Sequence, residues 1–119
     1  MDDENCVRET ASDMISFFGF DVVCVKDGAE VIEEYKSART NNNPYNAVIL
    51  DLTIPGGMGG ELAVKKLLNY DPNVTAIVAS GYSTDPIMAN YSRYGFKARL
   101  TKPYNLQEVG NVLRSTLRN

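Results

Sequence analysis

The chain has 119 residues, of which 44% are hydrophobic and 23% charged, and its formal net charge is −3. This length and hydrophobic content predict a single domain with its own core, and the acidic balance argues against direct nucleic-acid binding, which depends on clustered Lys and Arg. No run approaches the roughly 18 apolar residues of a membrane span. We therefore expect a cytoplasmic domain without membrane contact, whether or not a longer parent protein is membrane-anchored.

The first part of the chain alternates between helical and extended patterns. Apolar residues recur at helical spacing over residues 4–18, and Gly19 follows where a helix ends. A short β-branched run over residues 20–25 predicts a strand, and helical spacing returns over residues 29–39. The polar, proline-broken residues 41–44 predict a connection to the next strand.

A buried strand over residues 47–52 is the central prediction. Its apolar residues run directly into Asp51, and such a run without alternation is typical of a parallel strand covered on both faces. In open α/β sheets, ligands bind beyond the carboxyl ends of the strands, so Asp51 is predicted to face a site. An isolated Asp after a strand more often only begins a turn, so this assignment depends on its companions.

The second half continues the alternation. The glycine-rich residues 56–60 lack the Lys and Ser/Thr of a P-loop and favour a flexible connection over a nucleotide cradle. The further predicted elements are helices over residues 61–68 and 86–94, strands over 74–79 and 98–101, and an amphipathic helix from 106 to the end. Asn105 and Glu108 have the spacing of a capping box for this last helix. Strands that alternate with helices predict a parallel sheet with helices on both faces.

Polar residues fall in order at loops and strand ends: Asp2-Asp3-Glu4, Asp51 with Pro55 four residues on, Ser80-Gly81 and Lys102-Pro103-Tyr104. In this combination the chain resembles the receiver domain of two-component response regulators over essentially all of residues 1–119. Its Leu-Thr-Lys-Pro-Tyr-Asn run and its glycine loop are most similar to the receivers of hybrid sensor histidine kinases. The resemblance implies a flavodoxin-like, doubly wound parallel sheet of five strands.

The resemblance also implies a role for each of these residues. Asp51 would accept a phosphoryl group from a phosphohistidine of a histidine kinase or a histidine-containing phosphotransfer domain, since the chain has no histidine itself. Mg²⁺ (or Mn²⁺) would be bound by Asp3, Asp51 and the backbone carbonyl of Thr53, with Asp2 assisting through water. Oxygen ligands of this kind suit a hard cation, which also neutralises the clustered carboxylates.

The remaining implied residues complete the switch. Ser80 and Lys102 would bind the phosphoryl group, and the bond before Pro103 would be cis. The chain is then a conformational switch that assists its own phosphorylation and dephosphorylation, and not an enzyme in its own right.

Two departures from the family pattern stand out. The family usually carries Tyr or Phe three residues before the Lys, whereas this chain has Arg99. Output is therefore predicted to use Arg99 itself, or Tyr104. The family also begins with an apolar strand before the acidic pair, of which only Met1 is present here. We expect a longer parent chain whose upstream segment supplies that strand, with another chain or a rearranged pairing as alternatives.

Other readings stay open. Aspartyl-nucleophile phosphatases also use a strand-end Asp with Mg²⁺, but they generally carry a second Asp two residues on, where this chain has Thr53. A degenerate receiver-like module that only mediates protein contacts has no need for the full set of polar residues. Tyr82, Tyr91 and Tyr94 are compatible with a contact face for a homodimer.

Overall fold

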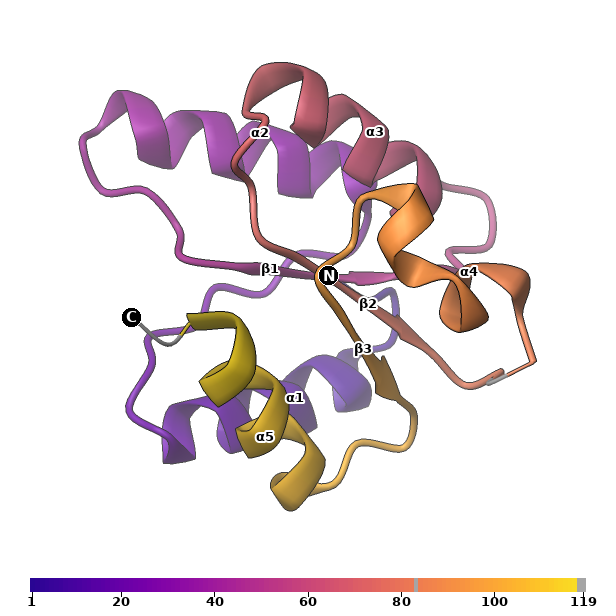
Figure 1. Ribbon diagram of the computed structural model, residues 1–119. Coiled ribbons are helices and arrows are strands. Elements are labelled where there is room, and N and C mark those ends of the chain that lie inside the picture. Colours follow the sequence, from indigo (N-terminus) through magenta and orange to yellow (C-terminus); the bar gives the residue numbers. More distant parts are fainter. Residues whose placement is uncertain (83, 118–119) are drawn as a thin grey trace.

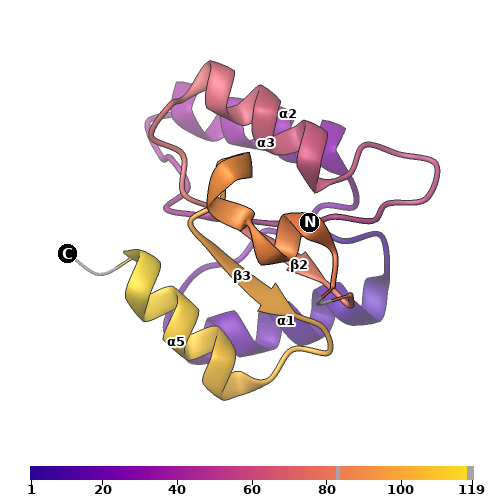
Figure 2. The same cartoon turned by 45° about the vertical axis from the view of Figure 1, so that its right-hand side comes forward.

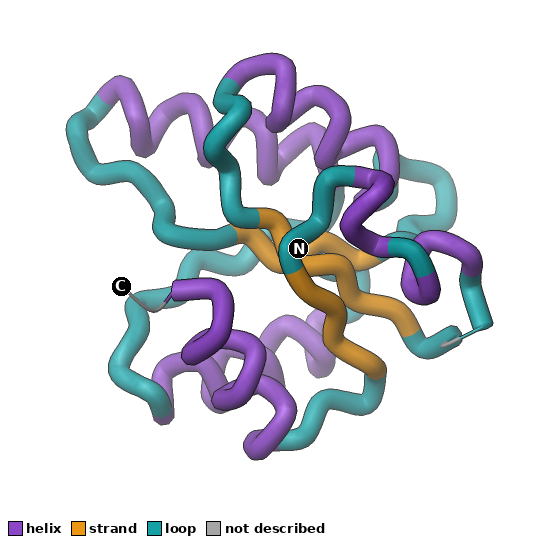
Figure 3. The backbone as a smooth tube through the Cα atoms, in the orientation of Figure 1, coloured by secondary structure: helices purple, strands orange, loops and turns teal. Residues whose placement is uncertain are grey.

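The computed structural model describes residues 1–82 and 84–117. A parallel three-stranded sheet in the order β1-β2-β3 lies in the middle of the molecule (Figure 1, Figure 3). The strands are β1 (Val48–Asp51), β2 (Ala76–Ser80) and β3 (Ala98–Thr101). β1 and β2 are rich in apolar residues, as expected for strands covered on both faces, whereas buried and more exposed residues alternate along β3.

Helices cover both faces of the sheet. They are α1 (Asn5–Phe17), α2 (Gly28–Thr40), α3 (Gly60–Tyr70), α4 (Pro86–Ala89), the 3₁₀ helix η1 (Tyr91–Tyr94) and α5 (Leu106–Leu117). Figure 1 and Figure 2 show α2 and α3 on one side of the sheet and α1 and α5 on the other. The predicted doubly wound arrangement is confirmed, although the described residues form three strands instead of the five expected. Within the described residues, no helix is long and apolar enough to cross a membrane.

The core divides into two layers because successive strand residues point to opposite faces. Leu50, Val78 and the α3 residue Leu67 belong to the layer under α2 and α3. Ile77 and Leu100 belong to the layer under α1 and α5. Both layers pack against the strands, and this packing positions the residues at the strand ends.

The predicted strand over residues 20–25 is wrong as a ladder strand. This segment forms no strand in the structure, and its backbone contact with the sheet region is the bond from the Asp2 amide to the Val25 carbonyl, 3.1 Å. A strand exists only through its neighbours, because its N–H and C=O groups need partners. Within residues 1–82 and 84–117, the backbone partner of this segment is the Asp2 amide.

The predicted helix over residues 86–94 is also interrupted. α4 ends after one turn, and Asn90 leaves the helical conformation with φ −125° and ψ 42° before η1 begins. The carbonyl of Met88 accepts a hydrogen bond from Arg99 Nη1 at 3.0 Å. In a continuous helix this carbonyl would instead accept from the amide four residues later, so a side chain from β3 competes with the helix.

Two local predictions are refined. Asn105 caps α5 by accepting from the Glu108 amide at 2.8 Å, while the Glu108 carboxylate accepts from the Thr101 amide at 2.8 Å and so ties α5 to β3. The expected continuation of α5 beyond residue 117 lies outside the described residues. The glycine loop is a connection, as predicted, but a packed one: a Cβ on Gly60 would lie 3.0 Å from the Asp51 carbonyl oxygen.

Candidate functional site

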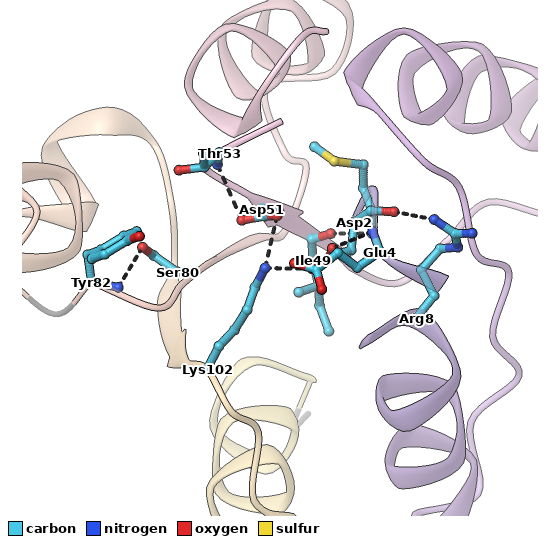
Figure 4. Close-up of polar contacts among 10 residues, drawn as sticks. Asp2, Glu4, Arg8, Ile49, Asp51, Thr53, Ser80, Tyr82 and Lys102 are labelled. Atoms are coloured by element: carbon cyan, nitrogen blue, oxygen red, sulfur yellow. Dashed lines mark hydrogen bonds and ion pairs between the residues drawn. The ribbon is translucent and has the colours of Figure 1, made fainter. Parts of the chain in front are cut away.

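The carboxyl ends of the three strands bring the predicted polar residues to one edge of the sheet. Asp51 ends β1, Ser80 ends β2, and Lys102 directly follows β3. Parallel pairing fixes the positions of these residues along the strands. Ser80 lies opposite Thr101, and the Lys102 amide donates to the Ser80 carbonyl at 2.9 Å. Figure 4 shows Lys102 reaching toward Asp51 and Asp2, with the Ser80 hydroxyl directed to the Tyr82 amide. The edge therefore forms one polar site.

The N-terminal residues join the site through backbone pairing with β1. The Asp51 amide donates to the Met1 carbonyl at 3.3 Å, and the Met1 ammonium donates to the Ile49 carbonyl at 2.8 Å. This pairing places the next residue, Asp2, beside Asp51. Asp2 is buried, whereas Asp3 is exposed.

Lys102 lies between two buried carboxylates. Its Nζ is 2.6 Å from Asp2 Oδ2 and 2.9 Å from Asp51 Oδ2 (Figure 4). The relative exposures of Asp2 and Asp51 are 4% and 3%, so both ion pairs are shielded from water. One cation is thus shared by two carboxylates that would otherwise repel each other strongly in this low-dielectric position.

This arrangement shifts the pKa values of both partners. Burial raises the pKa of Asp51, an effect that the hydrogen bonds from Lys102 and from the Thr53 amide, 3.3 Å from Oδ1, oppose. Burial alone would lower the pKa of Lys102, but its contacts with Asp2 and Asp51 outweigh this and raise it. Lys102 is therefore a stable cation at neutral pH, available for any anion that approaches Asp51.

The acidic N-terminus offers ligands for a cation. Carboxylate oxygens of Asp2, Asp3 and Glu4 lie within 4.8 Å of one another. In the described part of the chain, Asp51 is not a member of this group, and its Oδ2 faces Lys102. The cluster of oxygen donors fits a hard divalent cation, which prefers carboxylates and retained water.

The remaining predicted residues lie around this centre. The Ser80 side chain is buried and its Oγ accepts from the Tyr82 amide at 3.0 Å, while the Tyr82 side chain is 70% exposed. Thr53 is exposed just after β1. The Lys102–Pro103 peptide bond is cis.

The two residues considered for output differ in their burial and in their contacts. Arg99 is exposed on β3 and reaches back to α4. Tyr104 is partly buried and packs against the layer under α1 and α5. Burial raises the pKa of Tyr104, which keeps its hydroxyl neutral.

Three residues of the site were given no role in it from the sequence. Glu4 completes the carboxylate cluster, and its amide donates to Asp2 Oδ1 at 3.0 Å. Arg8 Nη1 donates to the Asp2 carbonyl at 2.7 Å, one helical turn along α1. The position of Arg8, one turn after Glu4, was the sequence feature that could have indicated its contact with the acidic residues. No sequence feature indicated the place of the Met1 ammonium, because that place depends on pairing with a distant strand.

Comparison with known families gives one match over most of the chain. The family model for the response regulator receiver domain matches residues 1–114. The chemotaxis protein CheY of Thermotoga maritima is 28% identical over 114 residues, which are 95% of this chain and 90% of that protein. The response regulator RR06 of Streptococcus pneumoniae is 26% identical over 117 residues, or 98% of this chain. The chain spans about half, 51%, of the length of RR06.

Solved structures share the fold. The CheX–CheY–BeF₃–Mg²⁺ complex of Borrelia burgdorferi has a TM-score of 0.86 and 23% identity, and the match covers 99% of this chain and 86% of that one. The receiver domain of the sensor histidine kinase PA1611 of Pseudomonas aeruginosa has a TM-score of 0.85 and 19% identity, and the match covers 100% of this chain and 94% of that one. That structure holds a magnesium ion in its active-site cleft.

Proposed function

The chain belongs to the response regulator receiver domain family, and from this premise we propose that Asp51 is its phospho-acceptor. The phosphoryl donor is a phosphohistidine on a histidine kinase or a histidine-containing phosphotransfer domain. In the transfer, a carboxylate oxygen of Asp51 bonds to phosphorus, and the P–N bond breaks with its electron pair returning to the partner's imidazole. The product is an acyl phosphate that acts as the signal of a two-component switch.

The contact between Lys102 and Asp51 is the observation that carries this proposal. Phosphoryl transfer depends mainly on positioning and on stabilising charge at the transferred oxygens. Lys102 Nζ lies 2.9 Å from Asp51 Oδ2. From this position its positive charge can stabilise the carboxylate before transfer and the oxygens of the phosphoryl group after it. The buried Ser80 hydroxyl at the end of the neighbouring strand offers a hydrogen bond to the same group.

A divalent cation fits the acidic side of the site. Asp3, Asp51 and the Thr53 carbonyl would hold Mg²⁺, with Asp2 assisting through water, and Mn²⁺ shares the preference for such oxygen ligands. The cluster of carboxylates at Asp2 and Asp3 supports this donor set. The cation supplies charge neutralisation when bound. The magnesium ion in the PA1611 receiver is a further argument by analogy.

Two finer features also belong to this proposal. The chain assists hydrolysis of its own acyl phosphate, because Thr53 is exposed beside Asp51 and leaves room for water. The partner proteins are other members of a phosphorelay, and the similarity to hybrid kinase receivers and homodimerisation stay predictions.

Intact-mass measurement with acetyl phosphate and Mg²⁺ tests the acceptor. We expect a gain of one phosphoryl group that Asp51→Asn or chelation of the metal abolishes. Asp13→Asn, at an exposed position of α1, is the matched control and keeps the adduct. Lys102→Ala slows labelling by roughly a hundredfold, a common cost of removing a charge-stabilising contact, while the exposed Lys97→Ala leaves it unchanged.

Circular dichroism of every variant confirms folding first. A folded protein that gains no mass, or an adduct that persists in Asp51→Asn, refutes the assignment of Asp51.

A further inference from the structure

The backbone that carries Lys102 is bonded to two other elements. The Thr101 amide donates to Glu108 Oε1 at 2.8 Å, and the Lys102 amide donates to the Ser80 carbonyl at 2.9 Å. Amides at the end of a strand need partners when water does not supply them. A carboxylate in the first turn of α5 is the partner of the Thr101 amide. The backbone beside the site lysine is therefore fastened to α5 as well as to β2.

The ammonium of Lys102 depends on where this backbone lies. A flexible chain of methylene groups separates the Lys102 backbone from Nζ. Nζ nevertheless lies 2.6 Å from Asp2 Oδ2 and also 2.9 Å from Asp51 Oδ2. Contact with both carboxylates restricts the place from which the side chain can start. A shift of the backbone at Thr101 would therefore lengthen at least one of the two contacts.

Glu108 is itself placed by the packing of α5. Its amide donates to Asn105 Oδ1 at 2.8 Å, which holds the first turn of the helix. The next residues, Val109 and Gly110, are buried, and a Cβ on Gly110 would lie 2.5 Å from Phe18 Cζ. The helix dipole also favours a carboxylate in the first turn. The start of α5 thus presents the Glu108 carboxylate at a defined position.

We infer that Glu108 is a positioning residue for Lys102: through the Thr101 amide it sets the position from which the lysine reaches Asp51. The inference rests on the proposed role of Lys102 in phosphoryl transfer, and Glu108 itself does not contact the phosphoryl group. In a capping box alone, the Glu108 carboxylate would bond the Asn105 amide. It bonds instead the amide next to the site lysine. Its effect therefore reaches the site as well as the start of α5.

Labelling rates with acetyl phosphate and Mg²⁺, measured by intact mass, test this role in variants that circular dichroism shows to be folded. We expect Glu108→Ala to slow labelling about tenfold, less than the roughly hundredfold for Lys102→Ala, because the ammonium remains but is less well placed. Glu108→Gln keeps an oxygen that accepts from the Thr101 amide, so its rate stays within about twofold of that of the unchanged protein. Gln107→Ala, exposed on the same turn, is the matched control and labels normally.

A second variant replaces Glu108→Ala if that protein does not fold. Glu108→Asp keeps the charge in the first turn of α5, but its side chain is too short to reach the Thr101 amide. We expect it to slow labelling by about tenfold as well.

Two further measurements separate positioning from general destabilisation. In a Lys102→Ala background, we expect Glu108→Ala to slow labelling by less than about twofold, since it acts through that lysine. Before any donor is added, NMR is expected to show the Lys102 Cε signal shifted in Glu108→Ala but not in Gln107→Ala. If the unchanged protein takes no label, the proposed function fails, and this NMR comparison alone decides the role of Glu108.

Each of the following results overturns the inference. Glu108→Ala labels as fast as Gln107→Ala. Glu108→Gln labels as slowly as Glu108→Ala, which assigns the effect to the charge and not to the hydrogen bond. Glu108→Ala slows labelling equally with and without Lys102, or leaves the Lys102 signal unchanged, which assigns its effect to the stability of α5.

Discussion

The negative charge of Asp51 is compensated by a lysine that Asp51 shares with a second carboxylate. Its Oδ2 faces Lys102, but the same ammonium lies 2.6 Å from Asp2 Oδ2. Two buried carboxylates share this lysine, with the buried amino group of Met1 near them both, in a position where charge is costly. At the residue scale, a change in the charge of either carboxylate therefore changes the contacts that remain for Lys102.

The first prediction follows from the raised pKa of Asp51, which burial causes. The fold favours the protonated form, so its favourable contribution is complete below the ordinary value of 3.8 and is lost as pH rises through the raised value. Asn resembles the protonated form at every pH. We expect Asp51→Asn to be more stable than the unchanged protein at neutral pH by about 1 kcal/mol, with the difference shrinking toward about pH 4.

Urea unfolding in a buffer with chelator measures this difference, and Asp13→Asn is the control. Equal or lower stability of Asp51→Asn at neutral pH would contradict the prediction.

At the element scale, polar side chains join the ends of α2 and α3. The buried Tyr35 of α2 donates its hydroxyl to Asp71 Oδ2 at 2.6 Å, just after α3, and Arg39 Nη1 lies 3.0 Å from the same oxygen. Lys36 and Arg39 lie over the ring of Tyr70, 5.2 and 5.4 Å from its centroid. These contacts hold the carboxyl-terminal ends of the two helices together.

Tyr35→Phe tests this junction. The Tyr35 hydrogen bond lowers the pKa of Asp71, so its stabilisation is present above the ordinary value of 3.8 and is lost as pH falls below it. We expect the variant to lose about 1.5 kcal/mol at neutral pH, as for a hydrogen bond to a charged group, and less in acid. Urea unfolding over a range of pH measures it, beside Tyr91→Phe as control. A penalty that does not change with pH would indicate lost packing instead.

The contact between Arg99 and α4 is a second junction between elements. Its hydrogen bond to the Met88 carbonyl competes with continuation of α4. We expect Arg99→Ala to change exchange rates in residues 86–94 by roughly tenfold, since hydrogen bonds from charged groups contribute about 1.5–3 kcal/mol, while β1 to β3 stay unchanged. Hydrogen exchange with mass spectrometry measures this, and Arg93→Ala is the control. Unchanged exchange in this segment would exclude a structural role for Arg99 there.

The whole molecule is compact, with a radius of gyration of 13.0 Å, about that of a single domain of this length. Its acidic site lies between the N-terminus and the strand ends, so a cation bound there contacts the fold only in its native form. Anything that binds the native state alone stabilises the entire fold by mass action.

We therefore predict that Mg²⁺ raises the thermal midpoint. At ten times its dissociation constant the gain is about 1.4 kcal/mol, or several degrees for a domain of this size. Asp3→Asn removes most of the shift, whereas Asp21→Asn, exposed outside the site, retains it. Scanning calorimetry at increasing Mg²⁺ concentration measures the effect. An equal shift in Asp3→Asn would place the cation elsewhere.

The sequence by itself determined most helices, the three ladder strands and the edge of the sheet to which Asp51, Ser80 and Lys102 come. Apolar runs such as the one before Asp51 identify buried strands, and parallel strands necessarily bring their carboxyl ends to one edge. The companions Ser80 and Lys102 could therefore be placed beside Asp51 without coordinates. Asn105 was likewise predictable as a cap, because capping depends on neighbours within one turn.

Only the tertiary structure decided the rest. Residues 20–25 have the composition of a strand but form none, because a ladder needs partners on the neighbouring strand and the position beside them holds only two residues. α4 ends early because Arg99, from another element, takes one of its carbonyls. Lys102 is shared by Asp2 as well as Asp51 because backbone pairing brings the N-terminus against β1. Each of these outcomes depends on contacts between residues far apart in sequence, which local periodicity does not encode.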